Sequence, residues 1–295
     1  SHPWPETSAL LLAGQSRVGK HSRTPLIPDD VFAALFGEAH DLVKNGDVLL
    51  DLRAGIDSLA ASSTSQNRTS REKAKNAYLR ANGWIGGLRT LKAKLLELRI
   101  ACYIVVASLS GCRNHELTYL NSDACYRTED DEGESYWWMR SQSDKTGAGR
   151  TEWMVPEAAV KALAIMDRWA VPYQAAIADE IALRRAQNPK DPEIAEAQVH
   201  AKAVFLGQHH KLEGRVRTLS DANWNLQLRK FAKSRGIDWH FTTHQFRRKF
   251  ANYAARSRFG DLRYLREHFK HWSQDMTNDA YALNDSQEMA LYAEI

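Results

Sequence analysis

The chain has 295 residues, enough to bury one large hydrophobic core or two modest ones. Its 43% apolar and 26% charged residues match an ordinary globular protein, and its net charge of +4 permits an anionic partner such as nucleic acid without requiring one. The three cysteines, Cys102, Cys112 and Cys125, include no C-x-x-C pair, which excludes a disulfide framework and favours reduced thiols. No apolar run approaches a membrane span and no signal-peptide pattern begins the chain, so we expect a cytoplasmic protein that does not contact membranes.

The N-terminal part of the chain predicts a linker followed by a helix. Residues Ser1 to Ser22 carry two prolines among scattered polar residues and are typical of a linker. Pro28 and the two acidic residues after it mark a helix start, because proline fits the first turn and acids suit the positive end of the helix dipole. We expect this helix to continue through Val43, with Val31 and Leu35 on its apolar face.

The next two segments differ in composition. Ser58 to Arg71 is rich in Ser, Thr, Asn and Arg and poor in apolar residues, which indicates an exposed loop, with nucleic-acid contact as the alternative. Apolar residues dominate from about Leu88 to Leu109, and Gly111 follows them. We therefore expect a buried helix that ends near this glycine.

The rest of the chain predicts a hairpin and several helices. The β-rich runs Tyr136 to Arg140 and Arg150 to Val155 flank a glycine-containing turn, which is typical of a β-hairpin. An alanine-rich helix is expected from about Glu157 to Ala186, and Ser220 caps a helix that runs to Gly236. The remaining expectations are a short strand at Val204 to Leu206 and a helical C-terminal region with breaks near 239–242, 259–260 and 271–274.

The run Ser110-Gly-Cys-Arg-Asn-His-Glu-Leu117 holds the first candidate site residues. Arg113 and Glu116 stand three positions apart, so on a helix they share a face and can form an ion pair. One interpretation is a surface ion pair without functional meaning. The other is that Gly111 ends the preceding helix, Arg113 points into a cleft and Glu116 holds it there. Arginine is the side chain suited to fork onto two phosphate oxygens.

A second run begins at Thr243 and places His244 and Arg247 on one helix face, with two phenylalanines on a different, apolar face. His240 and His244 also form an H-x-x-x-H pair, which is a possible zinc-binding pattern. The glutamate that completes a metalloprotease motif is absent, so we expect no metal and no other cofactor.

The third run lies near the C-terminal end, where His271, Trp272 and Tyr281 stand among polar residues. Taken alone, a tyrosine in such a segment is usually a half-buried packing residue. Only the order of all the motifs along the chain gives it another meaning.

That order is S-G-x-R-x-x-E-L, a β-hairpin with a lysine at its tip, H-x-x-R, H-x-S-x-x-M-T and a tyrosine. It resembles the tyrosine recombinase or phage integrase family, from about Arg23 to the end and including the hairpin through Pro156. The resemblance implies an α+β, mainly α-helical fold with a small three-stranded antiparallel sheet. By the same resemblance the catalytic residues would be Arg113, Lys145, His244, Arg247, His271 and Tyr281, supported by Glu116 and Trp272.

The chain departs from the family pattern at the fifth of these positions. The family usually has nine, sometimes ten, residues from this position to the tyrosine and accepts His or Trp there. His271 lies ten positions before Tyr281 and Trp272 lies nine before it, and the H-x-S context favours His271. Phe269 and Lys270 also stand where the family often has Leu-Gly.

The resemblance further implies a catalytic domain over residues 23–295, preceded by a linker over 1–22. The stretch of about 45–90 would be a family-variable insertion, since it lengthens the path between the first helix and Arg113. The N-terminal core-binding domain of the family is expected to be missing from this chain.

The implied activity is site-specific cleavage and rejoining of DNA through a 3′-phosphotyrosine, without metal or ATP. Tyr281 would attack phosphorus, Arg113 and Arg247 would neutralise the phosphate, and Lys145 would protonate the leaving 5′-oxygen. Double-stranded DNA is the implied partner, bound by a homotetramer on paired sites in the nucleoid of a bacterium. The alternatives are a type IB topoisomerase-like enzyme and a DNA-binding relative that has lost catalysis.

Overall fold

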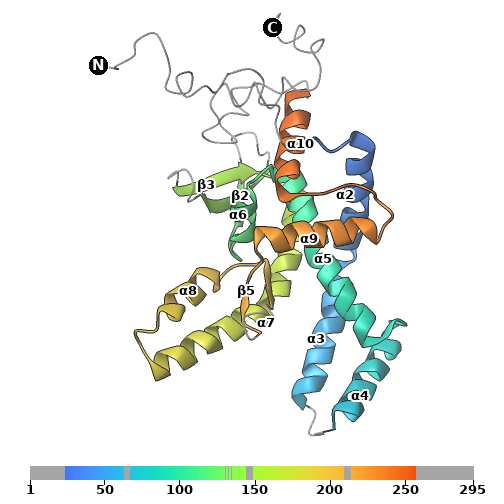
Figure 1. Ribbon diagram of the computed structural model, residues 1–295, viewed down its shortest axis with the longest axis vertical. Coiled ribbons are helices and arrows are strands. Elements are labelled where there is room, and N and C mark those ends of the chain that lie inside the picture. The colour runs from blue at the N-terminus through green and yellow to red at the C-terminus, as the bar shows by residue number, and fades with distance from the viewer. Residues whose placement is uncertain are drawn as a thin grey trace, which may run out of the picture.

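The computed structural model describes residues 24–62, 67–129, 131, 133, 135–143, 149–208 and 214–256. Helices surround one long central helix, with a three-stranded antiparallel sheet of order β1-β2-β3 beside it (Figure 1). This confirms the expected mainly helical α+β fold with a small three-stranded sheet. In chain order the described elements are α2 (Asp29–Lys44), α3 (Gly46–Ser62), α4 (Arg68–Ala81), α5 (Gly87–Ser110), α6 (Asn114–Thr118), β1 (Cys125–Glu129), β2 (Ser135–Ser143), β3 (Gly149–Met154), α7 (Glu157–Gln187), α8 (Pro192–His200), β4 (Leu206–Gln208), β5 (Val216–Thr218), α9 (Asp221–Lys233) and α10 (Thr243–Arg256).

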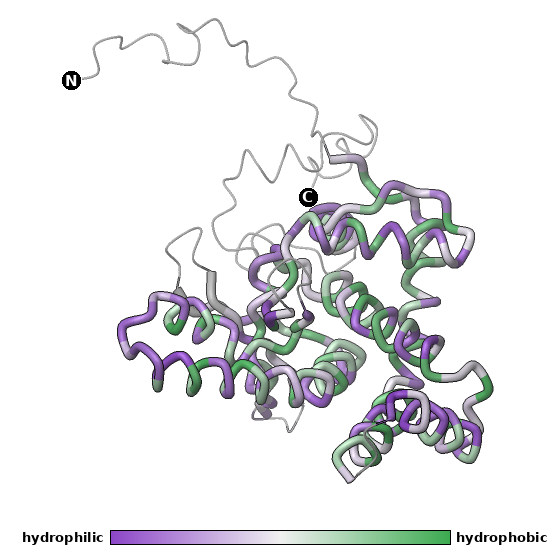
Figure 2. Tube along the Cα trace, turned by 60° about the horizontal axis from the view of Figure 1, so that its bottom comes forward, coloured by the Kyte–Doolittle hydropathy of each residue, from purple (hydrophilic) through white to green (hydrophobic). Residues whose placement is uncertain are grey.

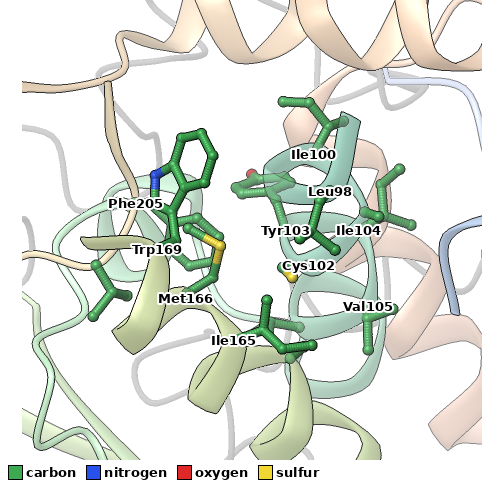
Figure 3. Packing of buried hydrophobic residues seen from close by; sticks show 14 of the residues in the cluster. Leu98, Ile100, Cys102, Tyr103, Ile104, Val105, Ile165, Met166, Trp169 and Phe205 are labelled. Atoms are coloured by element: carbon green, nitrogen blue, oxygen red, sulfur yellow. The ribbon is translucent and has the colours of Figure 1, made fainter. Parts of the chain in front are cut away.

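Helix α5 forms the centre of the core. Every residue from Leu98 to Ser108 is buried, because α2, α7, α9 and α10 all pack against this helix. Met166 and Trp169 of α7 face the apolar side chains of α5 (Figure 3). Full burial of such a side chain contributes about 1.5–3 kcal/mol, so the apolar run expected to form a buried helix provides much of the folding free energy.

The helix expected through Val43 and the buried helix expected from about Leu88 to Leu109 agree with α2 and α5. Helix α2 starts at Asp29, directly after Pro28, and buries Leu35, Ala39 and Val43 at four-residue intervals. Hydrophilic and hydrophobic residues alternate along the helices in this way over much of the described chain (Figure 2).

The loop expected from Ser58 to Arg71 is wrong in large part. Helix α3 continues to Ser62 and α4 begins at Arg68, so the connection between the two helices is only five residues long. Asn67 caps α4, and its side chain accepts a hydrogen bond from the Thr69 N–H. A polar composition marks a segment as exposed but does not exclude a helix. Leu59, Ala60 and Ala61 favour the helical end of α3, and the two arginines of the segment favour the start of α4.

Helix α3 is attached to α7 at an unusual point. Pro172 lies inside α7 and has no N–H, so the carbonyl of Arg168 lacks its normal helical donor. Arg53 of α3 replaces that donor, because its Nη2 donates to the Arg168 carbonyl at 2.7 Å and its Nη1 to the Trp169 carbonyl at 3.1 Å. The α3–α4 pair is thereby fixed to the body of the molecule.

Short elements account for most of the other differences from the sequence expectations. Helix α8 follows the alanine-rich helix and was not expected. Pro192 stands in its first turn, where the N-cap Asp191 accepts from the Glu193 N–H. The short strand expected at Val204 to Leu206 lies two residues later, as β4, and pairs with β5, which was not among the expected strands. Among the described residues, no helix has the length and apolar composition needed to cross a bilayer.

Candidate functional site

The candidate site begins at the end of α5. Gly111 adopts the left-handed conformation (φ 61°, ψ 15°) and its N–H bonds to the Ala107 carbonyl, which ends the helix. The Ser110 hydroxyl donates to the Val106 carbonyl at 2.7 Å and accepts from the Cys112 N–H at 3.3 Å. The Ser-Gly pair of the first motif therefore makes a tight turn that leads directly into Arg113.

Glu116 holds Arg113 from two sides. Its Oε1 accepts from Arg113 Nη1 at 2.9 Å, and its Oε2 accepts from the Arg113 backbone N–H at 2.6 Å. The Glu116 side chain is 1% exposed and that of Arg113 is 21% exposed. In a surface ion pair both side chains would be exposed to solvent. The geometry therefore favours the interpretation in which Glu116 fixes a partly accessible Arg113.

The sheet also contacts this pair, through a hydrogen bond from strand β2. The Ser141 hydroxyl of β2 donates to the Glu116 carbonyl at 2.6 Å. Strand β2 pairs with β3 from Trp138 opposite Met154 to Ser143 opposite Gly149, which confirms the predicted hairpin. Lys145, expected at the tip of this hairpin, lies outside the described residues.

Helix α10 carries the second motif. Phe246 is buried in the core, and this fixes the rotation of the helix. His244 is exposed, whereas Arg247 is 2% exposed and donates from Nη1 to the Gly111 carbonyl at 2.8 Å. The buried Lys249 donates to Asp29 and to the Ile27 carbonyl, which ties α10 to the start of α2.

Three of the expected site residues line one pocket of about 440 Å³, namely Arg113, His244 and Arg247. The pocket lies between the start of α6, the start of α9 and the first two turns of α10. Residues more than 130 positions apart in the sequence therefore meet at one concavity. The full lining is Cys112, Arg113, Asn114, His115, Thr118, Tyr119, Leu219, Ser220, Asp221, Thr243, His244 and Arg247.

The pocket favours an anion. Its lining contains two arginines, two histidines and only one acidic residue, Asp221. Helix α10 also begins at the pocket, and a helix N-terminus carries a partial positive charge. Cys112 is the one thiol in the lining, and burial raises its pKa well above the ordinary value, so the group stays protonated and is a poor nucleophile.

A hydrogen-bonded network joins the three helices around the pocket. Asp221 Oδ1 accepts from Asn114 Nδ2 at 2.6 Å and from the Thr243 hydroxyl at 3.1 Å. The Tyr103 hydroxyl donates to Asn114 Oδ1 at 2.7 Å, while its ring stacks on Trp224 in the core at 4.1 Å. This network sets the position of α6 relative to α10, and therefore that of Arg113 relative to His244 and Arg247.

None of these network residues was expected from the sequence. Ser220 was expected to cap a helix, and its hydroxyl does accept from the Asn223 N–H, but nothing in the sequence indicated that Asp221 contacts α6 and α10. Asn114 occupies a variable position of the first motif. Only the packing of the three helices reveals the role of these side chains.

The remaining candidates lie outside the described residues. They are His271, Trp272 and Tyr281, together with the linker expected over 1–22. His240, the other half of the H-x-x-x-H pair, accepts from Arg229 Nη1 at 3.0 Å and is not among the residues that line the pocket. All three cysteines are free thiols, as expected.

No family model matches the chain, and no curated protein matches it. Among solved structures, it is similar to XerH site-specific recombinase bound to difH substrate in a pre-cleavage complex (TM-score 0.44) and to palindromic difH in a post-cleavage complex (TM-score 0.46), both at 13% identity. These alignments cover 91% and 96% of this chain but 52% and 56% of those chains, so it spans about half their length. It is also similar to XerA recombinase, with a TM-score of 0.41, 17% identity and coverage of 90% and 98%. These values do not establish a family.

Proposed function

We propose that this protein breaks and rejoins DNA as a site-specific recombinase of the tyrosine type. One observation supports the proposal most. Arg113, His244 and Arg247 come from two motifs that were singled out by sequence order alone, and they line the same anion-favouring pocket. A chance resemblance of short motifs gives no reason for them to meet.

The residues fit the chemistry of a phosphodiester. The non-bridging oxygens repel a nucleophile, and charge grows on them in the pentavalent transition state. Arg113 and Arg247 would neutralise that charge, and a donor that is already held in place costs little reorganisation at the moment of reaction. The bonds from Arg113 to Glu116 and from Arg247 to the Gly111 carbonyl support this role.

Tyr281 would be the nucleophile. Its phenolic oxygen forms a bond to phosphorus while the bond from phosphorus to the 5′-oxygen breaks, and the phenolic proton passes to His244 or to water. Lys145 would give its proton to the departing 5′-oxygen, and His271 or Trp272 would donate a hydrogen bond to the phosphate. The phosphotyrosine keeps the bond energy, so the reverse attack by a 5′-hydroxyl needs no ATP.

Strand exchange requires two duplexes and several copies of the enzyme. We therefore include in the proposal a homotetramer on paired DNA sites and duplex DNA as the substrate. A type IB topoisomerase-like enzyme would use the same chemistry on one duplex. Transfer of a labelled strand to a second duplex distinguishes the two activities.

Covalent trapping on nicked duplexes tests the proposal. When cleavage occurs next to a nick, the short product diffuses away and leaves the protein attached to DNA. Wild-type protein should form an adduct that disappears on protease treatment. Tyr281→Phe should bind DNA equally well and form none, because only the phenolic oxygen is removed.

Tyr292→Phe provides the matched control, since it removes the same atom from another tyrosine near the C-terminal end. It should form the adduct at the wild-type rate. An adduct with Tyr281→Phe would overturn the assignment of the nucleophile, and the absence of any adduct with the wild-type protein on a library of nicked duplexes would overturn the proposed activity.

A further inference from the structure

The positive charge of the chain is concentrated in one segment that lies away from the pocket. Residues 67–94 contain eight Arg or Lys residues and a single acidic residue, Glu72, which gives this segment a net charge of +7. The whole chain carries +4, so all the other residues together carry −3. We refer to residues 67–94, which form α4 and the first turns of α5, as the basic arm.

The cations of the basic arm are presented to solvent. Arg68, Lys73, Arg80, Arg89 and Lys92 are all exposed, and none forms an ion pair with any described residue. Like charges gathered in a short segment repel one another, and a basic patch of this kind is the electrostatic footprint of a surface that binds a polyanion.

The basic arm is rigid. The Tyr78 hydroxyl of α4 packs onto Gly55 of α3 so closely that a Cβ at this glycine would lie 1.9 Å from the hydroxyl oxygen. Asn76 Oδ1 accepts from the Leu88 N–H at 2.9 Å, and Trp84 Nε1 donates to the Gly87 carbonyl at 3.0 Å. The backbone that carries the cations is therefore held in place, and only their side chains have to be ordered when a partner binds.

Helix α5 separates the basic arm from the pocket. It starts at Gly87 next to α4 (Figure 1) and ends at Ser110, two residues before Cys112, which lines the pocket. A helix of 24 residues is about 36 Å long, which equals the length of roughly ten base pairs of duplex DNA. The two positive surfaces are thus distinct sites.

The composition of α4 fits phosphates better than a protein surface. Its exposed residues combine Arg and Lys with Thr69 and Ser70, the side chains that contact phosphate and sugar. Protein interfaces depend on large apolar anchors, and no large apolar side chain of α4 is exposed.

We propose that the basic arm is a second DNA-binding surface, which holds duplex DNA through phosphate contacts at a place separate from the pocket. The choice of duplex DNA as the polyanion rests on the proposed function. The DNA comes either from the flank of the cleaved duplex or from a second duplex.

The salt dependence of binding tests this proposal. The full chain is titrated onto a labelled random duplex at several salt concentrations, and each phosphate contact contributes about 0.9 to the slope of log K against log salt. The variant R68Q/K73Q/R80Q should reduce the slope by about two to three. The control R185Q/K190Q/K202Q removes three exposed cations from α7 and its surroundings and should change the slope by less than about one.

A charge-preserving variant excludes a folding defect. R68K/K73R/R80K keeps every charge at the same positions and should retain the wild-type slope. If the arm variant and the control lower the slope equally, the proposal is overturned, and an acidic protein becomes the next partner to test.

The source of the DNA is identified with two duplexes. Protein saturated with a short duplex is offered a second duplex with a different label. Capture of the second duplex, lost in R68Q/K73Q/R80Q, identifies a separate duplex. If the second duplex is not captured, the length of a single duplex is varied. A longer duplex that binds the wild-type chain more tightly, but not the arm variant, identifies flanking DNA. If the wild-type chain forms the covalent adduct but the arm variant keeps the wild-type salt slope, the inference about the arm has failed. If the arm variant lowers the slope but the wild-type chain forms no adduct, the proposed function has failed.

Discussion

The two ends of α5 present positive charge in opposite ways. At its C-terminal end, Arg113 and Arg247 are largely withdrawn from solvent and each is held by a hydrogen bond of less than 3 Å. At its N-terminal end, five cations of the basic arm are exposed and have no ion-pair partner among the described residues, namely Arg68, Lys73, Arg80, Arg89 and Lys92. Buried donors that are held by hydrogen bonds stabilise charge at one point. Exposed cations attract a polyanion over a longer range, and dissolved salt screens this attraction. Substitutions at the two ends should therefore affect different measurements.

The largest effect is expected at the pocket. Arg113→Ala should slow formation of the covalent adduct by about 10²–10³-fold at saturating DNA, the usual cost of losing one fixed donor. Its slope of log K against log salt should change by no more than about one, since at most one phosphate contact is lost. Single-turnover cleavage and salt titrations measure the two quantities.

The arm variant R68Q/K73Q/R80Q is the counterpart of this substitution. It should show the reverse result, a lower salt slope with a normal cleavage rate once DNA saturates the protein. If Arg113→Ala and the arm variant change both quantities in the same proportion, the two ends of α5 do not have separate roles.

The pocket end could be predicted from the sequence to a much greater extent than the arm. Arg113, His244 and Arg247 belong to short motifs with fixed spacing, and Gly111 marks the turn that aims the first of them. Each motif is local, so a pattern of residues contains most of the information. The motifs meet at one pocket because the helices pack together. From the sequence, this meeting could be predicted only as something that the family resemblance implies.

The start of the arm, at the first turn of α4, was hidden by its own composition. The segment from Ser58 to Arg71 is polar because it is exposed, and the same property is typical of a loop. Its helices become visible only through helix propensity and through contacts between distant residues, such as Tyr78 with Gly55. The Asp221 network was equally unpredictable, since it joins residues from three helices.

The attachment of the arm to the body can be broken at Arg53. Arg53→Met should lower the free energy of unfolding by about 0.5–1.5 kcal/mol, because the Arg168 carbonyl, which faces Pro172, loses its donor. In a Pro172→Ala background the helix supplies its own N–H to the Arg168 carbonyl, so the same substitution should cost less. Urea unfolding of the four proteins in this cycle gives the coupling energy.

A coupling of at least about 0.5 kcal/mol is expected for residues that share one hydrogen-bonding group. An additive cycle would mean that Arg53 does not replace the missing donor. The α3–α4 pair would then be held to α7 mainly by its other contacts, those of Asp47 and Asp51 with Arg168.

The smallest effect concerns Asp47, which joins α3 to α7 through Lys161 and Arg168. The hydrogen bond from Lys161, followed by that from Arg168, holds the pKa of Asp47 below its ordinary value of 3.8. Because the folded pKa is the lower one, the ion pairs stabilise the folded chain above pH 3.8, and this contribution is lost as the pH falls through the folded pKa. Asp47→Asn should therefore lower the free energy of unfolding near pH 7 by about 0.2–1 kcal/mol, the range of exposed pairs, and this deficit should vanish in acid.

Urea titrations of both proteins across this pH range provide the measurement. Asp57→Asn, on the same helix, forms no ion pair with a described residue and acts on Arg53 only through its charge at a distance, so it should show a smaller pH-dependent difference. An equal deficit for Asp47→Asn at neutral and acid pH would mean that the carboxylate contributes through packing and not through its charge.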